Sequence, residues 1–332
     1  MNVYAPAYYQ SFRCLAENCP DSCCKEWVID IDTDSAEKYF AMKGPLGDRL
    51  RKFLKNTDDG TVLEIENGQC PMWRQDGLCE IQAQLGHDAL CKTCREYPRI
   101  RHDYGDFAEL GLELSCPEAA RLILTAADHS YTVTSSPQTE SPEYDRTAMD
   151  ILLRSRKEIL SFLEDTAYSL PQSLTVLLLY AHAVQEELYG GAPATLNPKD
   201  MLLQADNFPK FGNIQDFFGF FMSLEILTPQ WKSRLESGPQ KAPWSPVFRT
   251  LAIYFVQRYW LQAVSDYDLI GRAKFAVCAG LLIRTLGGDT IQTAQLFSKE
   301  IENNPDNINA ILDGAYTSPA LTDLAIIHLL NH

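Results

Sequence analysis

The spacing of apolar residues predicts helices along most of the chain. From residue 146 to the end, apolar residues recur every three to four positions, which is the period of one helix face. Gly and Pro residues separate the periodic stretches from one another. An irregular helical bundle is the architecture that this pattern favours. The predicted helices span residues 146–164, 174–188, 213–227, 248–259, 266–286, 290–303, 306–315 and 319–330.

The first 130 residues show short pieces and few long periodic runs. Alternating apolar and polar residues predict strands at residues 61–66 and 107–114, which we expect to pair with each other. Short helices are predicted at residues 35–42, 48–56 and 117–127, and the last of these begins at a proline. The two patterns together predict a mainly α protein with a little β in its N-terminal part.

A stretch without apolar periodicity separates the two parts. Residues 132–143 are rich in Ser, Thr and Pro, a composition typical of a linker. We therefore predict a small cysteine-rich domain over residues 1–131, followed by an all-helical domain over residues 144–332.

Composition and charge exclude several classes of protein. The 332 residues are 45% apolar and 22% charged, as in a soluble globular protein. The net charge of −15 lacks the basic footprint of a nucleic-acid-binding protein. The longest apolar stretches, such as residues 174–183 and 276–283, are far shorter than the ~20 residues that a spanning helix needs. With no secretory signal visible at the N-terminus, we expect a cytoplasmic protein that binds neither nucleic acid nor membrane.

Cysteine placement is the strongest chemical signal. Nine of the ten cysteines lie before residue 117, in one run at residues 14–24 and a second group from residue 70 to residue 116. In the cytosol such clusters are typical of metal ligands or redox groups. Zinc and cubane iron–sulfur clusters both take four thiolates, so nine thiols suffice for two centres with one left over. The spacing leaves open whether the metal is zinc or iron.

Within the cysteine groups, individual roles stay open. Adjacent Cys23 and Cys24 point in different directions in any regular backbone, so they serve two sites or only one of them is a ligand. Cys91 and Cys94 could instead form a redox dithiol, although the βαβ context of a thioredoxin-like site is absent. Cys278, inside a predicted helix, is expected to be a small buried hydrophobic residue.

Other candidate residues give weaker signals. His87 and His102 flank the second cysteine group and are candidates for hydrogen bonding to the metal ligands rather than to the metal itself. The aromatic segment at residues 217–221 is expected to lie in a helix core rather than in a groove. Phosphate-loop, Rossmann and nucleophile-elbow motifs are all missing from the sequence. Any nucleotide-like cofactor must therefore be bound in another way.

The cysteine-rich stretches resemble the flagellin lysine N-methylase family. The resemblance rests on CLAENCPDSCC at residues 14–24 followed by KEWVIDID, and on CP at 70–71, GLC at 77–79, CKTCREYPR at 91–99 and LSCPE at 114–118. It covers about the first 120 residues by motif. The first spacings are four and three residues, whereas the broader group of zinc- or iron-chelating proteins has three and two.

This resemblance implies a lysine N-methyltransferase that uses S-adenosylmethionine and an iron–sulfur cluster (4Fe-4S, with zinc as the alternative) and acts on flagellin. The helical part would then recognise the protein substrate. A non-enzymatic zinc- or iron-binding module that docks a partner through its helical half is the alternative. The metal ligands implied by the motif are Cys14, Cys19, Cys23, Cys24, Cys70, Cys79, Cys91, Cys94 and Cys116.

Methyl transfer to lysine sets its own chemical requirement. The amine must be neutral, yet the reference pKa of lysine is about 10.4, so the site must desolvate it or supply a base. The sequence leaves open which residue acts and whether a cluster starts radical chemistry or only positions the cofactor. Candidate bases near the motif are Glu26, Asp30, Asp32, Tyr97 and Glu118.

Overall fold

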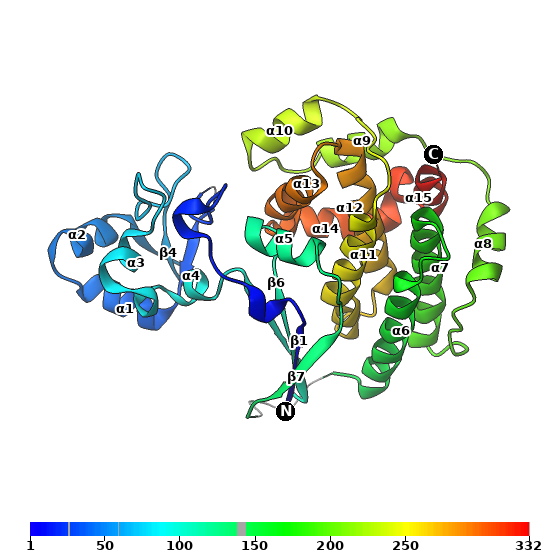
Figure 1. Ribbon diagram of the computed structural model, residues 1–332, viewed down its shortest axis with the longest axis horizontal. Helices are drawn as coiled ribbons and strands as arrows, with labels where there is room; N and C mark the ends of the chain where they lie inside the picture. Colours follow the sequence, from blue (N-terminus) through cyan, green and yellow to red (C-terminus); the bar gives the residue numbers. More distant parts are fainter. Residues whose placement is uncertain (26, 59, 138–143, 332) are drawn as a thin grey trace.

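The computed structural model describes residues 1–25, 27–58, 60–137 and 144–331. A helical bundle forms one side of the molecule and a smaller lobe forms the other (Figure 1). The described residues form fifteen α-helices and seven strands, and all of the strands lie before residue 136. The predicted fold class, mainly α with a little β in the N-terminal part, is confirmed.

The bundle is built around one helix, α12, that is buried on nearly every side. Sixteen of its eighteen residues are buried, so it lacks the polar stripe of a surface helix. It packs against α7, α11, α13 and α14. The bundle helices are α6 (Arg146–Glu164), α7 (Leu170–Leu188), α8 (Pro198–Asp206), α9 (Ile214–Met222), α10 (Pro229–Glu236), α11 (Pro246–Tyr259), α12 (Leu269–Leu286), α13 (Thr290–Phe297), α14 (Pro305–Thr317) and α15 (Asp323–Leu330).

The predicted bundle helices are confirmed, with two additions and three departures from the predicted bounds. The helix predicted at 213–227 ends at Met222, and the one predicted at 319–330 is a 3-10 turn, Pro319–Leu321, followed by α15. Helices α8 and α10 were not predicted, because each is short and buries few side chains. The predicted helix at 290–303 ends early as an α-helix and continues as a π-helical turn, Ser298–Glu302. Phe217, Phe218 and Phe221 are buried in α9, as expected for a helix core. None of the helices in the described ranges has both the length and the apolar character needed to cross a membrane.

The smaller lobe combines four short helices with a three-stranded antiparallel sheet in the order β2-β4-β3. Its own hydrophobic core contains Tyr39, Leu50 and Met72, together with Cys70 and Cys91. The helices predicted at 35–42 and 48–56 correspond to α1 and α2, but the second prediction is wrong for residues 54–56, which belong to strand β3. The elements are α1 (Thr33–Ala41), α2 (Gly44–Phe53), α3 (Glu80–Leu85), α4 (Lys92–Glu96), β2 (Ile29–Ile31), β3 (Leu54–Thr57) and β4 (Gly60–Leu63).

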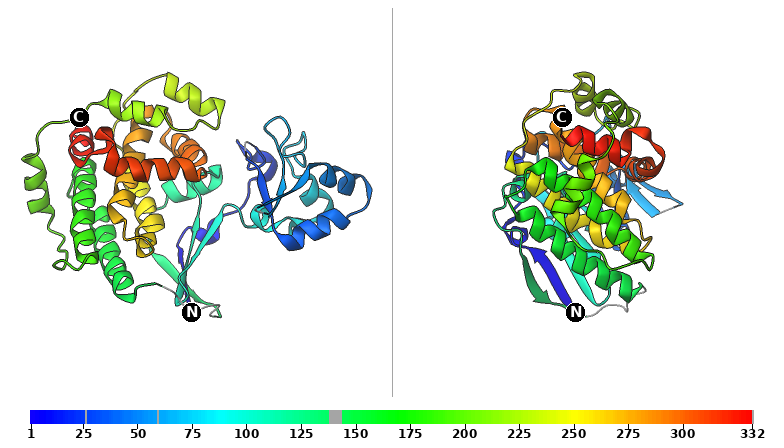
Figure 2. Two further views of the ribbon diagram at one scale, coloured as in Figure 1. Left: turned by 180° about the vertical axis from the view of Figure 1, so that it is seen from behind. Right: turned by 90° about the vertical axis from the view of Figure 1, so that its right-hand side faces the viewer.

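A second sheet connects the lobe to the bundle (Figure 2). Its strand order is β5-β6-β1-β7, with β1 (Asn2–Pro6) parallel to β6 (Phe107–Leu112). Strands β5 (Arg99–Asp103) and β7 (Tyr131–Ser135) form its edges. The predicted pairing of strands 61–66 and 107–114 is therefore wrong, because they belong to different sheets. Alternation fixes which face of a strand is buried but does not specify its partner.

The predicted linker at 132–143 is wrong for its first four residues. Residues 132–135 belong to β7 and pair with β1, which suits the β-branched side chains of Thr132, Val133 and Thr134. Residues 138–143 lie outside the described ranges. The division into 1–131 and 144–332 stays a prediction, although the large hydrophobic core also takes in Phe12, Leu112 and helix α5 (Pro117–Leu124).

Candidate functional site

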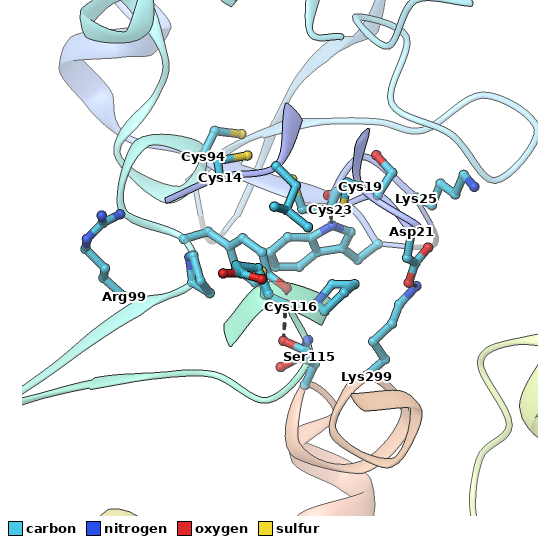
Figure 3. A pocket seen from close by; sticks show the side chains of 18 of the residues that line it. Cys14, Cys19, Asp21, Cys23, Lys25, Cys94, Arg99, Ser115, Cys116 and Lys299 are labelled. Atoms are coloured by element: carbon cyan, nitrogen blue, oxygen red, sulfur yellow. Dashed lines mark hydrogen bonds and ion pairs between the residues drawn. The ribbon is translucent and has the colours of Figure 1, made fainter. Parts of the chain in front are cut away.

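A pocket of about 330 Å³ lies where the smaller lobe meets the bundle. Its walls come from the loop before β2, from α4 and the chain that follows it, from the start of α5, and from residues 227, 228, 299 and 303 of the bundle. Five of the nine clustered cysteines line it (Figure 3). They are Cys14, Cys19, Cys23, Cys94 and Cys116. The other four, Cys24, Cys70, Cys79 and Cys91, lie in or against the core of the smaller lobe.

Backbone and ring contacts hold the first cysteine run against the second group. The amide N–H of Cys70 donates to the carbonyl of Cys24 at 2.7 Å. The indole N–H of Trp27 donates to the carbonyl of Cys23 at 2.6 Å, and the ring of Trp27 packs on Tyr97 at 5.6 Å between centroids. Residues more than forty positions apart in the sequence therefore share one wall of the pocket.

Three cysteines of the second group immediately precede helices. Cys79, Cys91 and Cys116 are the N-cap residues of α3, α4 and α5. Among the described residues, none of these three thiols forms a side-chain capping hydrogen bond with its helix. Burial raises the pKa of the Cys79 and Cys116 thiols, to about 12 at Cys116, whereas the neighbouring thiol of Cys94 is the main cause that lowers the pKa of Cys91. Burial therefore favours the protonated thiol at Cys79 and Cys116, and Cys91 is the one of the three whose surroundings favour the thiolate.

Thiol groups from both cysteine groups lie within hydrogen-bonding reach of one another. Cys23 bonds to Cys24, Cys24 bonds to Cys70, and Cys94 bonds to Cys91. The bond to Cys91, together with burial, raises the pKa of Cys94 far above its ordinary value, and the same bond lowers that of Cys91. Neighbouring thiols therefore share protons, since two adjacent thiolates repel each other in a buried setting.

The donor chemistry of these residues fits a thiolate-bound metal centre. Soft sulfur ligands select zinc, copper(I) or iron–sulfur clusters. A bound cation would relieve the repulsion that keeps Cys23 and Cys94 protonated. Within the described ranges, no three Cys, His, Asp or Glu side chains already converge on one metal position. The fold places five of the nine thiols around one pocket, and the assignment of all nine as ligands stays a prediction.

A polar contact joins the cysteine loop to the bundle. The Nζ of Lys299 donates to Asp21 at 2.9 Å, and Gln295 donates to the same oxygen at 3.1 Å. The same amide of Gln295 also donates to the carbonyl of Ser115 at 2.8 Å. Burial by itself would raise the pKa of Asp21, but the bonds and charge of Lys299 outweigh it and hold that pKa below its ordinary value. The carboxylate therefore stays charged and closes one end of the pocket (Figure 3).

Two of the carboxylates predicted as candidate bases, Asp30 and Asp32, lie away from this chemistry. Asp32 caps α1 by accepting from the N–H of Ser35 at 3.1 Å, and it also accepts from the N–H of Lys92 at 2.7 Å. The bond from Lys92 is the main cause that lowers its pKa, so Asp32 serves to join two helix ends. Asp30 is exposed and is not among the pocket residues. Glu26 lies outside the described residues.

Tyr97 and Glu118 do line the pocket. Burial raises the pKa of Tyr97 well above its ordinary value, and its hydroxyl lies 3.1 Å from that of Ser115. Glu118 forms a two-pronged ion pair with Arg121, at 2.8 and 2.7 Å. Tyr97 is therefore a neutral hydrogen-bonding group in the pocket. The carboxylate of Glu118 is already paired with Arg121.

The two histidines near the cysteines have separate surroundings. His87 lines the pocket. His102 lies on β5 near Glu109 and Arg258, and burial lowers its pKa. Cys278 is buried in α12 within the bundle core, as expected for a small hydrophobic residue.

Sequence reasoning missed the contribution of the bundle to this site. Leu227, Thr228, Lys299 and Asn303 line the pocket, but they lie more than a hundred residues from the nearest clustered cysteine. It also missed the charge of the lining, which has five cationic side chains against the carboxylates of Asp21 and Glu118. The cations are Arg13, Lys25, Arg95, Arg99 and Lys299. In a chain of net charge −15, this lining reverses the overall sign.

Comparisons with known proteins identify relatives. The chain is 33% identical over 135 residues to the flagellar biosynthetic protein FliU of Salmonella muenchen, a match that covers 39% of this chain and 80% of FliU. It is equally similar to the lysine-N-methylases of Salmonella typhimurium and Salmonella choleraesuis, of which the match covers 34%. No family model and no solved structure matches. Because the match takes in most of FliU, the chain belongs to the flagellin lysine methylase family that contains FliU and these lysine-N-methylases.

Proposed function

We propose that this protein is a lysine N-methyltransferase that transfers a methyl group from S-adenosylmethionine to lysine side chains of flagellin. One observation carries the proposal. A chain related to lysine-N-methylases and to a flagellar protein folds so that five clustered cysteines line a single pocket between its lobe and its bundle. A cytoplasmic location belongs to the same proposal.

A cysteine-bound iron–sulfur centre is part of this proposal. The residues that would hold it are drawn from the nine clustered cysteines, five of which line the pocket. When bound, such a centre supplies a site for electron transfer or for anchoring a ligand beside the pocket. The thiols of Cys23, Cys24 and Cys70, already within reach of one another, support such a role.

The pocket lining suggests how a lysine would lose its proton. Asp21 and Glu118 are both engaged in ion pairs, and Tyr97 keeps its proton. The excess of cationic side chains disfavours a further ammonium group, and partial burial disfavours it again. The lining therefore lowers the pKa of an entering lysine, and the proton leaves to solvent before the amine reaches the methyl donor.

The pocket is also placed to receive a lysine that projects from a folded or flexible protein. One wall comes from the bundle, where Leu227 is an exposed apolar residue beside Thr228. The apolar side chains Ile226 and Met222 are exposed just before it in the chain. We therefore assign recognition of the protein substrate to this side of the bundle.

The test is a metal analysis followed by a transfer assay on protein purified without oxygen. We expect iron with matching sulfide, an absorption band near ~400 nm, and transfer of labelled methyl from S-adenosylmethionine to purified flagellin. Flagellin with chemically acetylated lysines is the matched control and should take up no label. Stoichiometric zinc without sulfide and without transfer would contradict the proposal and favour a metal-binding interaction module.

A further inference from the structure

The pocket lining has a net positive charge, opposite in sign to the net charge of the chain, and this difference points to a bound ligand. Five cationic side chains line the pocket against two carboxylates, whereas the whole chain carries fifteen more acidic than basic residues. Both of those carboxylates are already paired, Asp21 with Lys299 and Glu118 with Arg121. The remaining cationic charge is thus not balanced by carboxylates among the described pocket residues.

Two of the three lining arginines contact Phe12, one through its ring and the other through its backbone carbonyl. The guanidinium of Arg99 lies 4.9 Å from the centroid of the Phe12 ring. Arg13, the next residue after Phe12, donates from Nη1 to the carbonyl of Phe12 at 2.7 Å and to that of Gln10 at 2.9 Å. Phe12 is 2% exposed and belongs to the large hydrophobic core. Its ring is therefore fixed, and it holds Arg99 in place through a cation–π contact.

Arg95, the third arginine, has a different role. It lies next to Cys94 in the chain, its Nη1 donates to the carbonyl of Leu90 at 3.2 Å, and its charge favours the thiolate of Cys91. The charge of Arg95 therefore acts on the neighbouring thiols. Arg99 lies at the end of the pocket opposite Lys299 and Asp21 (Figure 3).

We propose that Arg13 and Arg99, positioned by Phe12, form a subsite for a carboxylate group at this end of the pocket. Both guanidinium groups keep N–H donors that bond to no described residue, and neither forms an ion pair with a described carboxylate. The planar fork of a guanidinium matches a carboxylate in two parallel bonds. The carboxylate comes either from the amino-acid end of S-adenosylmethionine or from an acidic residue beside the target lysine.

Binding measured without turnover tests this subsite. The full-length, metal-loaded protein is titrated calorimetrically with S-adenosylmethionine, with 5′-methylthioadenosine, and with amidated lysine peptides that carry aspartate or asparagine neighbours. In Arg99→Gln and Arg13→Gln, we expect affinity for a carboxylate-bearing probe to fall by about tenfold to a hundredfold. Methylthioadenosine and the asparagine peptide, which lack the carboxylate, should bind unchanged.

Arg101→Gln is the matched control. Arg101 lies two residues from Arg99 on the same strand, pairs with Asp103 at 2.9 Å and is not among the pocket residues. Loss of affinity for S-adenosylmethionine alone identifies the cofactor as the source of the carboxylate, and loss for the aspartate peptide alone identifies the substrate.

Three outcomes would overturn the subsite. They are equal affinities in Arg99→Gln and Arg101→Gln, equal losses for probes with and without a carboxylate, and a wild-type protein that binds neither carboxylate probe. The choice of probes rests on the proposed function, but the readout does not. A protein that binds the carboxylate probe through Arg99 yet transfers no methyl group would contradict the methyltransferase and leave the subsite standing.

Discussion

The bundle and the smaller lobe bury their interiors by different means. The bundle core is made of large apolar side chains, with Phe297 packed edge-on or tilted against Trp231, Phe255 and Phe275. Among its described residues the smaller lobe has a core of fourteen buried side chains, which include Cys70 and Cys91, and Cys24, Cys79 and Cys94 pack against it. So small a core offers limited hydrophobic stabilisation. We therefore expect the stability of the lobe, but not that of the bundle, to depend on the metal that we propose its thiols bind.

The largest expected effect comes from removing a thiol. Cys23→Ser and Cys94→Ser should lose bound metal and unfold the smaller lobe, because metal binding and folding are coupled in small metal-binding units. Metal content by mass spectrometry and hydrogen exchange of α1 and α2 would report both losses. Cys278→Ser, in the bundle core, is the control and should retain the full metal content. If Cys278→Ser lost the metal as completely, the assignment of ligands would be wrong.

A core truncation in the bundle should have the opposite pattern. Phe297 is completely buried, so Phe297→Ala should lower the free energy of unfolding by about 3–5 kcal/mol. Metal content should stay largely unchanged, since Cys116 is the one predicted ligand among the described residues of the core that contains Phe297. Urea unfolding followed by metal analysis measures both quantities. Phe211→Ala, at a residue that is 47% exposed, should cost far less. Metal loss in Phe297→Ala would show that the stability of the smaller lobe depends on the packing of the bundle core.

The contact between the two regions should have an intermediate effect. Asp21→Asn keeps the shape of the side chain but removes the charge that pairs with Lys299, so we expect a loss of about 1–3 kcal/mol at this contact. Hydrogen exchange should rise in the 19–24 loop and stay constant in α12. The exposed pair of Lys232 and Glu236 gives the matched control, since Lys232→Ala should change little. Equal hydrogen exchange in Asp21→Asn and Lys232→Ala would show that Asp21 does not stabilise the contact between the lobe and the bundle.

The smallest effect concerns pH and the bundle alone. Asp323 lies 3.1 Å from His182 and 3.3 Å from Lys274. Burial raises its pKa, but these partners outweigh burial and hold the pKa below its ordinary value. The stabilisation is therefore present above the unfolded pKa of about 3.9 and is lost as the pH falls through the lower folded value.

Hydrogen exchange of α12 and α15 between pH 6 and pH 3 measures this dependence without interference from metal release in the lobe. Asp323→Asn should flatten the acid-induced rise in exchange. An unchanged pH profile in Asp323→Asn would assign the acid sensitivity to another group.

Local sequence patterns predicted the helices well because the period of apolar residues is a property of each segment. The stripe in residues 146–164 forms α6 with the predicted bounds, and the clustering of the cysteines is visible from their spacing alone. Strand partners were not predicted correctly, since β6 pairs with β1 and β5 rather than with β4. Pairing depends on which segments meet in space, and the alternation of side chains is the same for any partner.

The sequence by itself determined that this protein is mainly helical, that its N-terminal part carries nine clustered thiols, and that it resembles lysine methylases. The tertiary structure decided which five of those thiols line a pocket and which four lie only in or against the lobe core. It also decided that Lys299 and Gln295 close the pocket on Asp21, and that Arg13 and Arg99 share Phe12. Spacing along a chain determines local geometry, whereas a charged pocket arises only when segments far apart in the sequence pack together.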